Sequence, residues 1–122
     1  MIYNFTIYEV LPGLNDYTKA NRTNYHVGAS MKKNTGNLVA QSISRDLPNV
    51  KIKRPVIVRF HWVEPNKRRD LDNISFAKKF ILDGMVQAGL IPDDNQKYVK
   101  GFEDAFSIDP KYARVEVEVQ ET

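Results

Sequence analysis

The sequence predicts a single α+β domain, a small mixed β-sheet of about four strands with two main helices packed on one face of it. Three observations lead to this fold class. Four segments have the apolar patterns of strands, two have helical periodicity, and their order along the chain is β-α-β-α-β-β. The length of 122 residues, without repeats or linkers, fits one domain over residues 1–122.

The first half of the chain supplies one strand and one helix. The strand is predicted over residues 1–10, where apolar side chains alternate to one side. A break at residues 11–16 follows, and a polar run continues to about residue 25. The helix is predicted over residues 29–45, because apolar residues recur there at helical spacing.

The second half supplies the other three strands. Residues 56–63 form the clearest of them, and two more are predicted at residues 97–106 and 113–119, where apolar and polar residues alternate. The aromatic side chains that we expect in the core are Phe60, Trp62, Phe102 and Phe106.

The second helix is predicted over residues 73–88, after a break that follows the strand at 56–63. Asp72 or Asn73 is suited to cap its N-terminus, since both side chains accept hydrogen bonds from the first backbone N–H groups. Gly89 lies just beyond the predicted end, where a glycine commonly closes a helix.

The composition excludes several kinds of chemistry. The chain has no cysteine, which removes disulfides, thiolate catalysis and cysteine-based zinc sites. Only His26 and His61 are present, so a three-histidine metal site is impossible, and His61 is expected to be a packed or surface residue. No apolar stretch reaches the length of a membrane span and the N-terminus lacks the signal-peptide pattern, so we expect a soluble, untargeted protein.

The charge is unevenly distributed. Residues 51–69 contain seven basic residues and one acid, Glu64, whereas residues 101–122 contain six acids and two basic residues. Residues 17–44 contain four cations and no acid, and cations and aromatic residues interleave over residues 17–25. This polarity suits an anionic polymer bound on one face, the alternative being a solvated basic surface.

Four aspartates lie where loops meet helices or strands. Asp70 and Asp72 precede the second predicted helix, and Asp93 and Asp94 follow it. In an extended segment, carboxylates two residues apart point the same way, and oxygen ligands of this kind suit Mg²⁺ or Mn²⁺. Beside clustered cations, they are the groups needed for metal-assisted phosphodiester hydrolysis. The alternative is structural: Asp72 caps a helix, and the later pair forms a turn.

The pattern around these aspartates resembles that of the RusA family of Holliday-junction resolvases. The resemblance rests on Arg69–Asn73, followed by Lys79, Asp83–Met85, Ala88-Gly89 and Pro92–Gln96. It is densest over residues 68–96, and the opening with Pro12, Leu14 and Asn15 is compatible with it, so that it extends over the whole chain.

The resemblance implies a Mg²⁺-dependent endodeoxyribonuclease, active as a homodimer, that nicks a four-way DNA junction symmetrically in recombination and repair. By match to the family, Asp70 and Asp72 are the paired metal-binding residues and Asp94 is the third catalytic carboxylate. Asp93, its neighbour, is a candidate outer-sphere acid in the mechanism that follows. The resemblance also implies a bacterial or prophage origin and a cytoplasmic location.

The functional lysine of the family is the point at which this sequence departs from the pattern. The expected position is occupied by Phe76, and matching backwards from Asp83 places Lys79 there, with Ser75–Ala77 as three additional residues. Lys79 is therefore the predicted catalytic lysine, and the neighbouring Lys78 is the alternative.

The cations predicted to hold the DNA come from three segments of the chain. They are Lys67, Arg68 and Arg69, Lys53, Arg54 and Arg59, and Lys19 and Arg22. Two other functions stay open at this point. One is a non-catalytic nucleic-acid-binding module, and the other is a metal-dependent nuclease acting on other branched DNA or on RNA.

One geometric expectation follows from the predicted helix. A helix of about sixteen residues is roughly 24 Å long, so Asp94 lies beyond the end remote from Asp70. Two arrangements would bring them together: a shorter helix with a folded-back turn, or donation of Asp94 by a partner related by a two-fold axis.

Overall fold

The computed structural model describes all residues from Met1 to Thr122. Strands and helices follow one another as β1 (Ile2–Ile7), α1 (Leu14–Thr23), α2 (Tyr25–Asp46), β2 (Val56–Glu64), α3 (Leu71–Ser75), α4 (Lys78–Gln87), β3 (Val99–Ile108) and β4 (Arg114–Glu121). No helix has the length and apolar character needed to cross a membrane.

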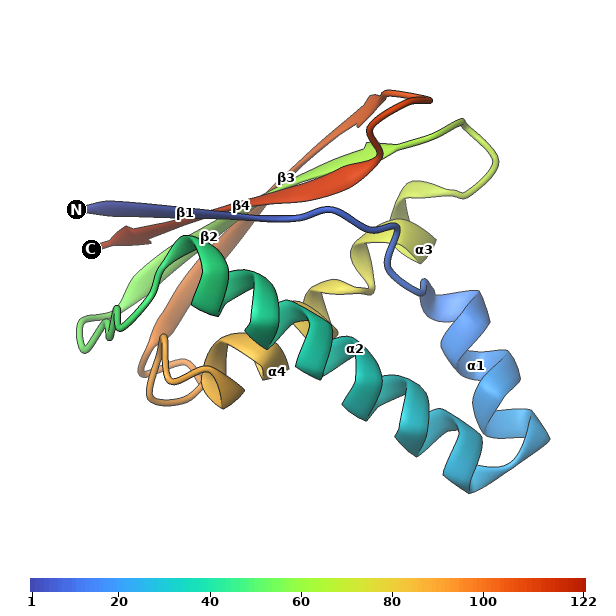
Figure 1. The fold of residues 1–122 in the computed structure, drawn as a ribbon, viewed down its shortest axis with the longest axis horizontal. Coiled ribbons are helices and arrows are strands. Elements are labelled where there is room, and N and C mark those ends of the chain that lie inside the picture. The colour runs from blue at the N-terminus through green and yellow to red at the C-terminus, as the bar shows by residue number, and fades with distance from the viewer.

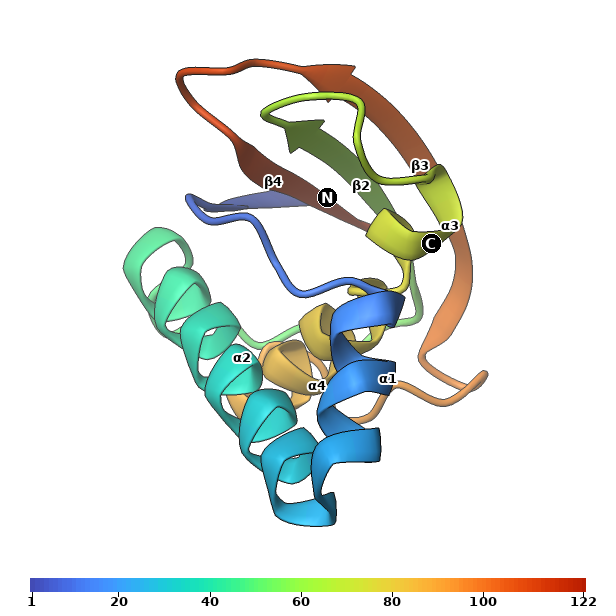
Figure 2. The ribbon, with the colours of Figure 1, turned by 90° about the vertical axis from the view of Figure 1, so that its right-hand side faces the viewer.

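The four strands form one mixed sheet in the order β1-β4-β2-β3. β4 is antiparallel to both of its neighbours, whereas β2 and β3 are parallel. Parallel neighbours require a crossover connection, which α3 and α4 provide. The helices lie on one side of the sheet and leave the other side open (Figures 1 and 2). The predicted α+β class is therefore confirmed.

The core lies between the sheet and the helices. Alternate residues of β2 point into it, and the rings of Phe60 and Trp62 stack with centroids 5.4 Å apart. From the helical side, Val39 of α2 and Phe80 and Met85 of α4 are fully buried against these strands. The predicted burial of Phe60 and Trp62 is confirmed.

The first helix, α1, was not predicted, because its residues are mostly polar and only Ala20 is buried. Packing of Tyr17 explains its formation, since this ring contacts Phe76 and Phe80 at centroid distances of 5.7 and 5.6 Å. Asp16 also accepts a hydrogen bond from the Gly13 N–H at 2.9 Å, which satisfies a backbone donor at the helix start.

The predicted helix over residues 73–88 is interrupted. α3 ends at Ser75 and α4 begins at Lys78, and the hydrogen bonds between them span three residues rather than four. The expected cap was also wrong: Asp70 occupies the N-cap position, and its side chain makes no capping bond. Gly89, in contrast, follows the helix with φ of +75°, the left-handed conformation expected there.

The other correction concerns Phe102, which is 44% exposed although it faces the same side as buried residues of β2. β3 is an edge strand that pairs only with β2, so its side chains lack a second neighbour. Phe106, further along β3, packs against the core as expected.

Candidate functional site

A groove of about 350 Å³ opens where the parallel strands β2 and β3 end and α3 begins. Glu64 closes β2, Ser107 lies near the end of β3, and Asp70 stands at the start of α3. The groove is lined by Glu64, Asn66, Lys67, Arg69, Asp70, Leu71, Ile74, Phe106, Ser107 and Ile108. The crevice beyond the carboxyl ends of parallel strands is a common ligand position, so this groove is the primary candidate site.

The segment before α1 packs directly beside α3 and fixes its position. The buried side chain of Asn73 accepts a hydrogen bond from the Asn15 N–H at 2.9 Å. Gly13 allows this close approach, because a Cβ on it would lie 2.5 Å from Asn73 Oδ1. The chain opening and the Asp70–Asn73 segment, which are far apart in sequence, therefore form one structural unit.

Arg69 lines the groove and is held by partners inside the protein. Its guanidinium donates to both oxygens of Glu64 at 2.9 Å, and also to the Leu11 carbonyl at 3.1 Å. Glu64 is only 7% exposed, so this is a nearly buried, bidentate ion pair. The placement gives Arg69 an internal partner, which does not favour its predicted role as a DNA-binding residue.

Asp70 and Asp72 make no side-chain bond in this fold. The extended segment expected to align the two carboxylates is absent, because Leu71 and Asp72 already belong to α3, and of the two only Asp70 lines the groove. Both are exposed, and neither carboxylate takes part in a hydrogen bond or an ion pair. Nearly all other carboxylates of the chain have such a partner. The carboxylates without one are those of Glu9, Asp70, Asp72 and Asp94. The structural alternative, in which Asp72 caps a helix, is therefore wrong.

The two later aspartates differ from each other. Asp93 forms a turn, accepting hydrogen bonds from the Asp94 N–H at 2.7 Å and from the Asn95 side chain at 3.0 Å. Asp94 is exposed and its carboxylate is free. The turn-forming alternative thus fits Asp93 and does not account for Asp94.

Asp94 lies at the opposite end of the β2–β3 pair from Asp70. Asp94 immediately precedes the turn into β3, whereas Asp70 shares its groove with Ser107 near the end of that strand. The span from Val99 to Ser107 is about 26 Å long at the usual rise of a strand. In Figure 1, α3 and the loop after α4 lie at opposite ends of β3.

Consequently, no three acidic or histidine side chains of one chain are grouped so that they could hold a metal ion. Of the two arrangements that would unite Asp70 and Asp94, the folded-back turn is absent, since α4 runs on to Gln87 and the chain then enters β3. Donation by a second copy remains a prediction.

The predicted cations fall into three surface groups. Lys67 and Arg68 are exposed beside Asp70 and have no carboxylate partner. Lys53 and Arg54 lie at the opposite end of β2, close to the Asp94 loop, where Val56 N–H donates to the Tyr98 carbonyl. The third group comprises Lys19 and Arg22 on α1, both exposed. Arg54 donates to the Thr122 oxygen at 3.2 Å, so the free groups are two acids and two cations at the Asp70 end, and Asp94 and Lys53 at the other end.

The two candidate lysines have different surroundings. Lys78 donates to Asp104 at 2.7 Å and lies 4.7 Å from the centre of the Phe102 ring, so it is held against the sheet edge. Lys79 is exposed and has no ion-pair partner. The interruption between α3 and α4 falls within the three residues that the family match treats as additional, Ser75–Ala77.

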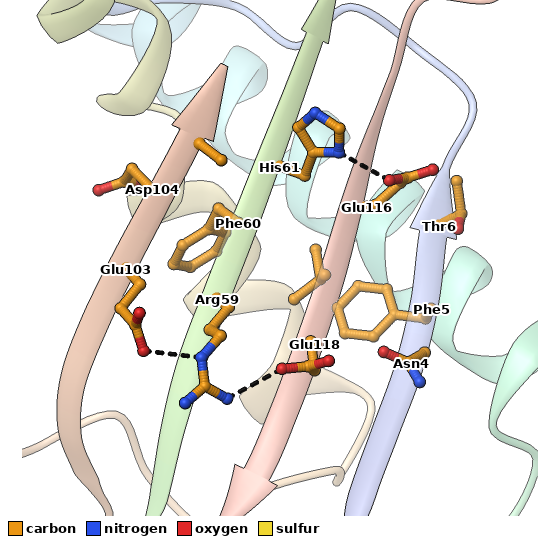
Figure 3. Close-up of a pocket in the computed structure, with 12 residues that line it drawn as sticks. Asn4, Phe5, Thr6, Arg59, Phe60, His61, Glu103, Asp104, Glu116 and Glu118 are labelled. Carbon is orange, nitrogen blue, oxygen red and sulfur yellow. Dashed lines mark hydrogen bonds and ion pairs between the residues drawn. The ribbon is translucent and has the colours of Figure 1, made fainter. Parts of the chain in front are cut away.

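Arg59 lies on the open face of the sheet, remote from the groove. Its guanidinium bonds Glu118 at 2.9 Å and Glu103 at 2.7 Å (Figure 3). These bonds raise the pKa of Arg59 above its usual value. Hydrogen bonds from Arg114 and His61 lower the pKa of Glu116 on the same face. The face is acidic overall, which does not favour Arg59 as a DNA contact.

Sequence reasoning did not identify Glu64 or Ser107 as parts of the site. For Glu64 a signal was present, because an acid isolated among seven cations is a natural partner for one of them. Ser107 gave no comparable signal, since its position depends on the pairing of β3 with β2. Asn73 belongs to the segment that carries the family resemblance, but its bond to Asn15 depends on the docking of a distant segment.

No protein-family model matches the sequence, and no curated protein matches it. The chemistry of the site therefore follows from its groups. Two free carboxylates beside two free cations suit a hard divalent ion together with a phosphate, since Mg²⁺ commonly takes one or two carboxylates and retains several waters.

Proposed function

We propose that the chain is a Mg²⁺-dependent endodeoxyribonuclease that cuts branched DNA, with the four-way junction as its substrate. The observation that carries the proposal is that Asp70, Asp72 and Asp94 are exposed carboxylates without a hydrogen bond or an ion pair. Free carboxylates of this kind have the chemistry of metal ligands. The resemblance to the RusA family, carried by the same residues, supplies the choice of substrate.

In this mechanism, Asp70 and Asp72 would hold the divalent ion, which when bound would supply Lewis-acid polarisation of the scissile phosphate and activation of a water. Lys67 and Arg68 hold the DNA backbone beside the groove. Lys79, whose ammonium group has no carboxylate partner, stabilises charge on the phosphate. The Glu64–Arg69 pair keeps the loop and the start of α3 in a fixed position beneath these groups.

The proposal includes a homodimer in which each site is completed by Asp94 of a second copy. The opposite ends of the β2–β3 pair bear complementary parts of one site: two aspartates at one end and a third at the other. A two-fold axis relates such ends reciprocally, so one dimer would hold two complete sites. Two equivalent sites suit paired cuts in a junction with two equivalent strands.

The test compares cleavage of a labelled four-way junction, a flap, a linear duplex and an RNA duplex with Mg²⁺, with Mn²⁺ and with chelator. Asp70→Asn should lower the junction cleavage rate more than about 100-fold, since residues that only support metal ligands already cost 10–100-fold. Glu9→Gln is the matched control, because Glu9 is the free carboxylate outside the site. It should cleave normally.

Each alternative has its own outcome. Junction binding that is unaffected by chelator, without nicking, would identify a non-catalytic nucleic-acid-binding module. Faster cleavage of flaps or RNA would retain the metal chemistry and change the substrate. Mixing Asp70→Asn with Asp94→Asn tests the shared site, since a heterodimer should regain one working centre. No recovery in a mixture proven to contain heterodimers would refute sharing.

A further inference from the structure

The helices α1 and α2 form a hairpin that projects away from the sheet. They lie side by side and are joined by Asn24, which ends α1 and caps α2 by accepting the His26 N–H at 2.8 Å. Gly28 is buried against Asn21, which lets the two helices approach closely near the turn. Figures 1 and 2 show the turn as the part of the molecule farthest from the strands.

An aromatic side chain is presented at this tip. Tyr25, the first residue of α2, is 77% exposed, and its hydroxyl makes no hydrogen bond. The ring contacts only His26 edge-on, at a centroid distance of 5.4 Å. Tyr25 is the first residue of α2, so its position at the tip is fixed by the α1–α2 turn.

The sequence segment that contains Tyr25 is cationic. Between Lys19 and Lys33 there are four basic residues and no acid. Only Lys32 has a carboxylate near it, Asp83 at 3.8 Å, and the first turn of α2 contains no acid to offset the positive end of the helix dipole. An exposed ring at the turn of a hairpin whose helices carry exposed cations matches a nucleic-acid strand, in which phosphates alternate with bases that can stack.

The geometry points to the α1–α2 tip as a binding site for unpaired or unstacked nucleotides, with Tyr25 stacked on a base and Lys19 and Arg22 on the adjoining phosphates. A regular duplex offers no free base face, so the tip would distinguish a branch point from a linear helix. The assignment rests on the proposed function for its choice of branched DNA, although binding at the tip requires no metal.

The test uses the full-length chain with Asp70→Asn, so that the DNA stays intact, and a four-way junction with the fluorescent base 2-aminopurine at the branch point. Tyr25→Ala should weaken junction binding by roughly 5-fold or more, the value for loss of one stacked base, and should abolish the fluorescence change. Affinity for a linear duplex of the same sequence should change less than about twofold.

Two control variants separate stacking from other effects. Tyr25→Phe keeps the ring and should bind the junction normally. Tyr112→Ala removes a tyrosine of similar exposure (70%) beside Asp109, away from the hairpin, and should also bind normally. Circular dichroism should show the same fold for all variants, because Tyr25 and Tyr112 make no core contact.

The outcomes distinguish this inference from the nuclease proposal. If Tyr25→Ala binds the junction as tightly as the parent, with the same fluorescence change, the tip assignment is overturned even where cleavage is observed. If the unmodified chain does not cleave but Tyr25→Ala still loses branched-DNA binding, the tip assignment holds and the nuclease proposal fails. Absence of any DNA binding by the parent would overturn the assignment as well.

Discussion

Replacement of Arg69 by alanine should destabilise the protein far more than replacement of the adjacent Arg68. Arg69 neutralises the nearly buried Glu64 through two hydrogen bonds of 2.9 Å and holds the Leu11 carbonyl through a third. Removing one partner of a buried ion pair costs about 3–5 kcal/mol, chiefly because the remaining charge is left without compensation. Since the Arg69 side chain is still 21% exposed, we expect the lower end of that range.

The expected loss is therefore about 3 kcal/mol in the free energy of unfolding, measured by urea denaturation followed by circular dichroism. For a domain of this size the melting temperature should fall by roughly 10 °C. Arg68→Ala should change stability by less than about 0.5 kcal/mol, because Arg68 is exposed and unpaired. Its effect should appear in DNA affinity instead.

A double-mutant cycle with Glu64→Ala then isolates the pair. Once Arg69 is absent, removal of Glu64 should cost much less than it does alone, since no buried charge is left unmatched. Additive effects of the two substitutions, or a loss below about 1 kcal/mol for Arg69→Ala, would refute the structural role. Arg69 would then return to the set of DNA-binding candidates.

Three further predictions concern other parts of the fold. Lys78→Met should lower the free energy of unfolding by about 1–2 kcal/mol, because it removes the hydrogen-bond partner of Asp104. Lys79→Met should leave stability unchanged and slow junction cleavage. The reverse pattern would make Lys78 the functional lysine. Gly84→Ala should lower the free energy of unfolding by about 1–3 kcal/mol, because the added Cβ would lie 2.5 Å from the Val39 side chain between α4 and α2. Gly101→Ala is the control and should not destabilise the fold, since no atom lies near the position of the added Cβ. Hydrogen bonds from Arg45 and the Thr6 N–H lower the pKa of Asp46 below its ordinary 3.8. The contribution of Asp46 to the free energy of unfolding should therefore be complete above about pH 5, and it should decrease as the pH falls through the lowered value. In denaturation experiments at a series of pH values, Asp46→Asn should lose less stability on acidification than the parent. An unchanged dependence on pH would contradict the role of Asp46.

The elements that could be predicted from sequence are those whose pattern reflects burial in the sheet. Alternation in β2 identified Phe60 and Trp62 as core residues, because side chains of a strand point alternately to opposite faces. The same reasoning was wrong for Phe102, since periodicity does not reveal that β3 is an edge strand.

Elements that depend on tertiary contacts could not be predicted. α1 has only one buried residue and forms because Tyr17 packs on two rings from another part of the chain. Likewise, the break after Ser75 accompanies a buried Asn73 bonded to the start of α1. In both cases the stabilising partner lies more than fifty residues away in the sequence.

The candidate site, too, could be predicted only in part from the sequence. Residue type and position singled out four aspartates, and the family resemblance chose Asp70, Asp72 and Asp94 among them; the structure leaves these three carboxylates without partners. Spacing also indicated that Asp94 could not reach Asp70 along one helix, which agrees with their opposite ends in the fold. The sequence could not distinguish a free cation such as Arg68 from an internally paired one such as Arg69, because pairing depends on which side chain turns toward Glu64.

The free carboxylates also predict how the protein responds to a divalent ion before any DNA is present. Asp70 and Asp72 carry like charges two residues apart with no hydrogen bond to offset their repulsion, so a bound cation should stabilise the folded state. At a concentration ten times the dissociation constant, the gain is about 1.4 kcal/mol, visible as a rise in melting temperature with Mn²⁺ or Mg²⁺. Asp70→Asn should abolish the rise, whereas Glu9→Gln should retain it. If Asp94 of a second copy completes the site, the rise should increase with protein concentration and should also be lost in Asp94→Asn. A rise that persists in both aspartate variants would place the ion elsewhere and remove the physical basis of the proposed metal site.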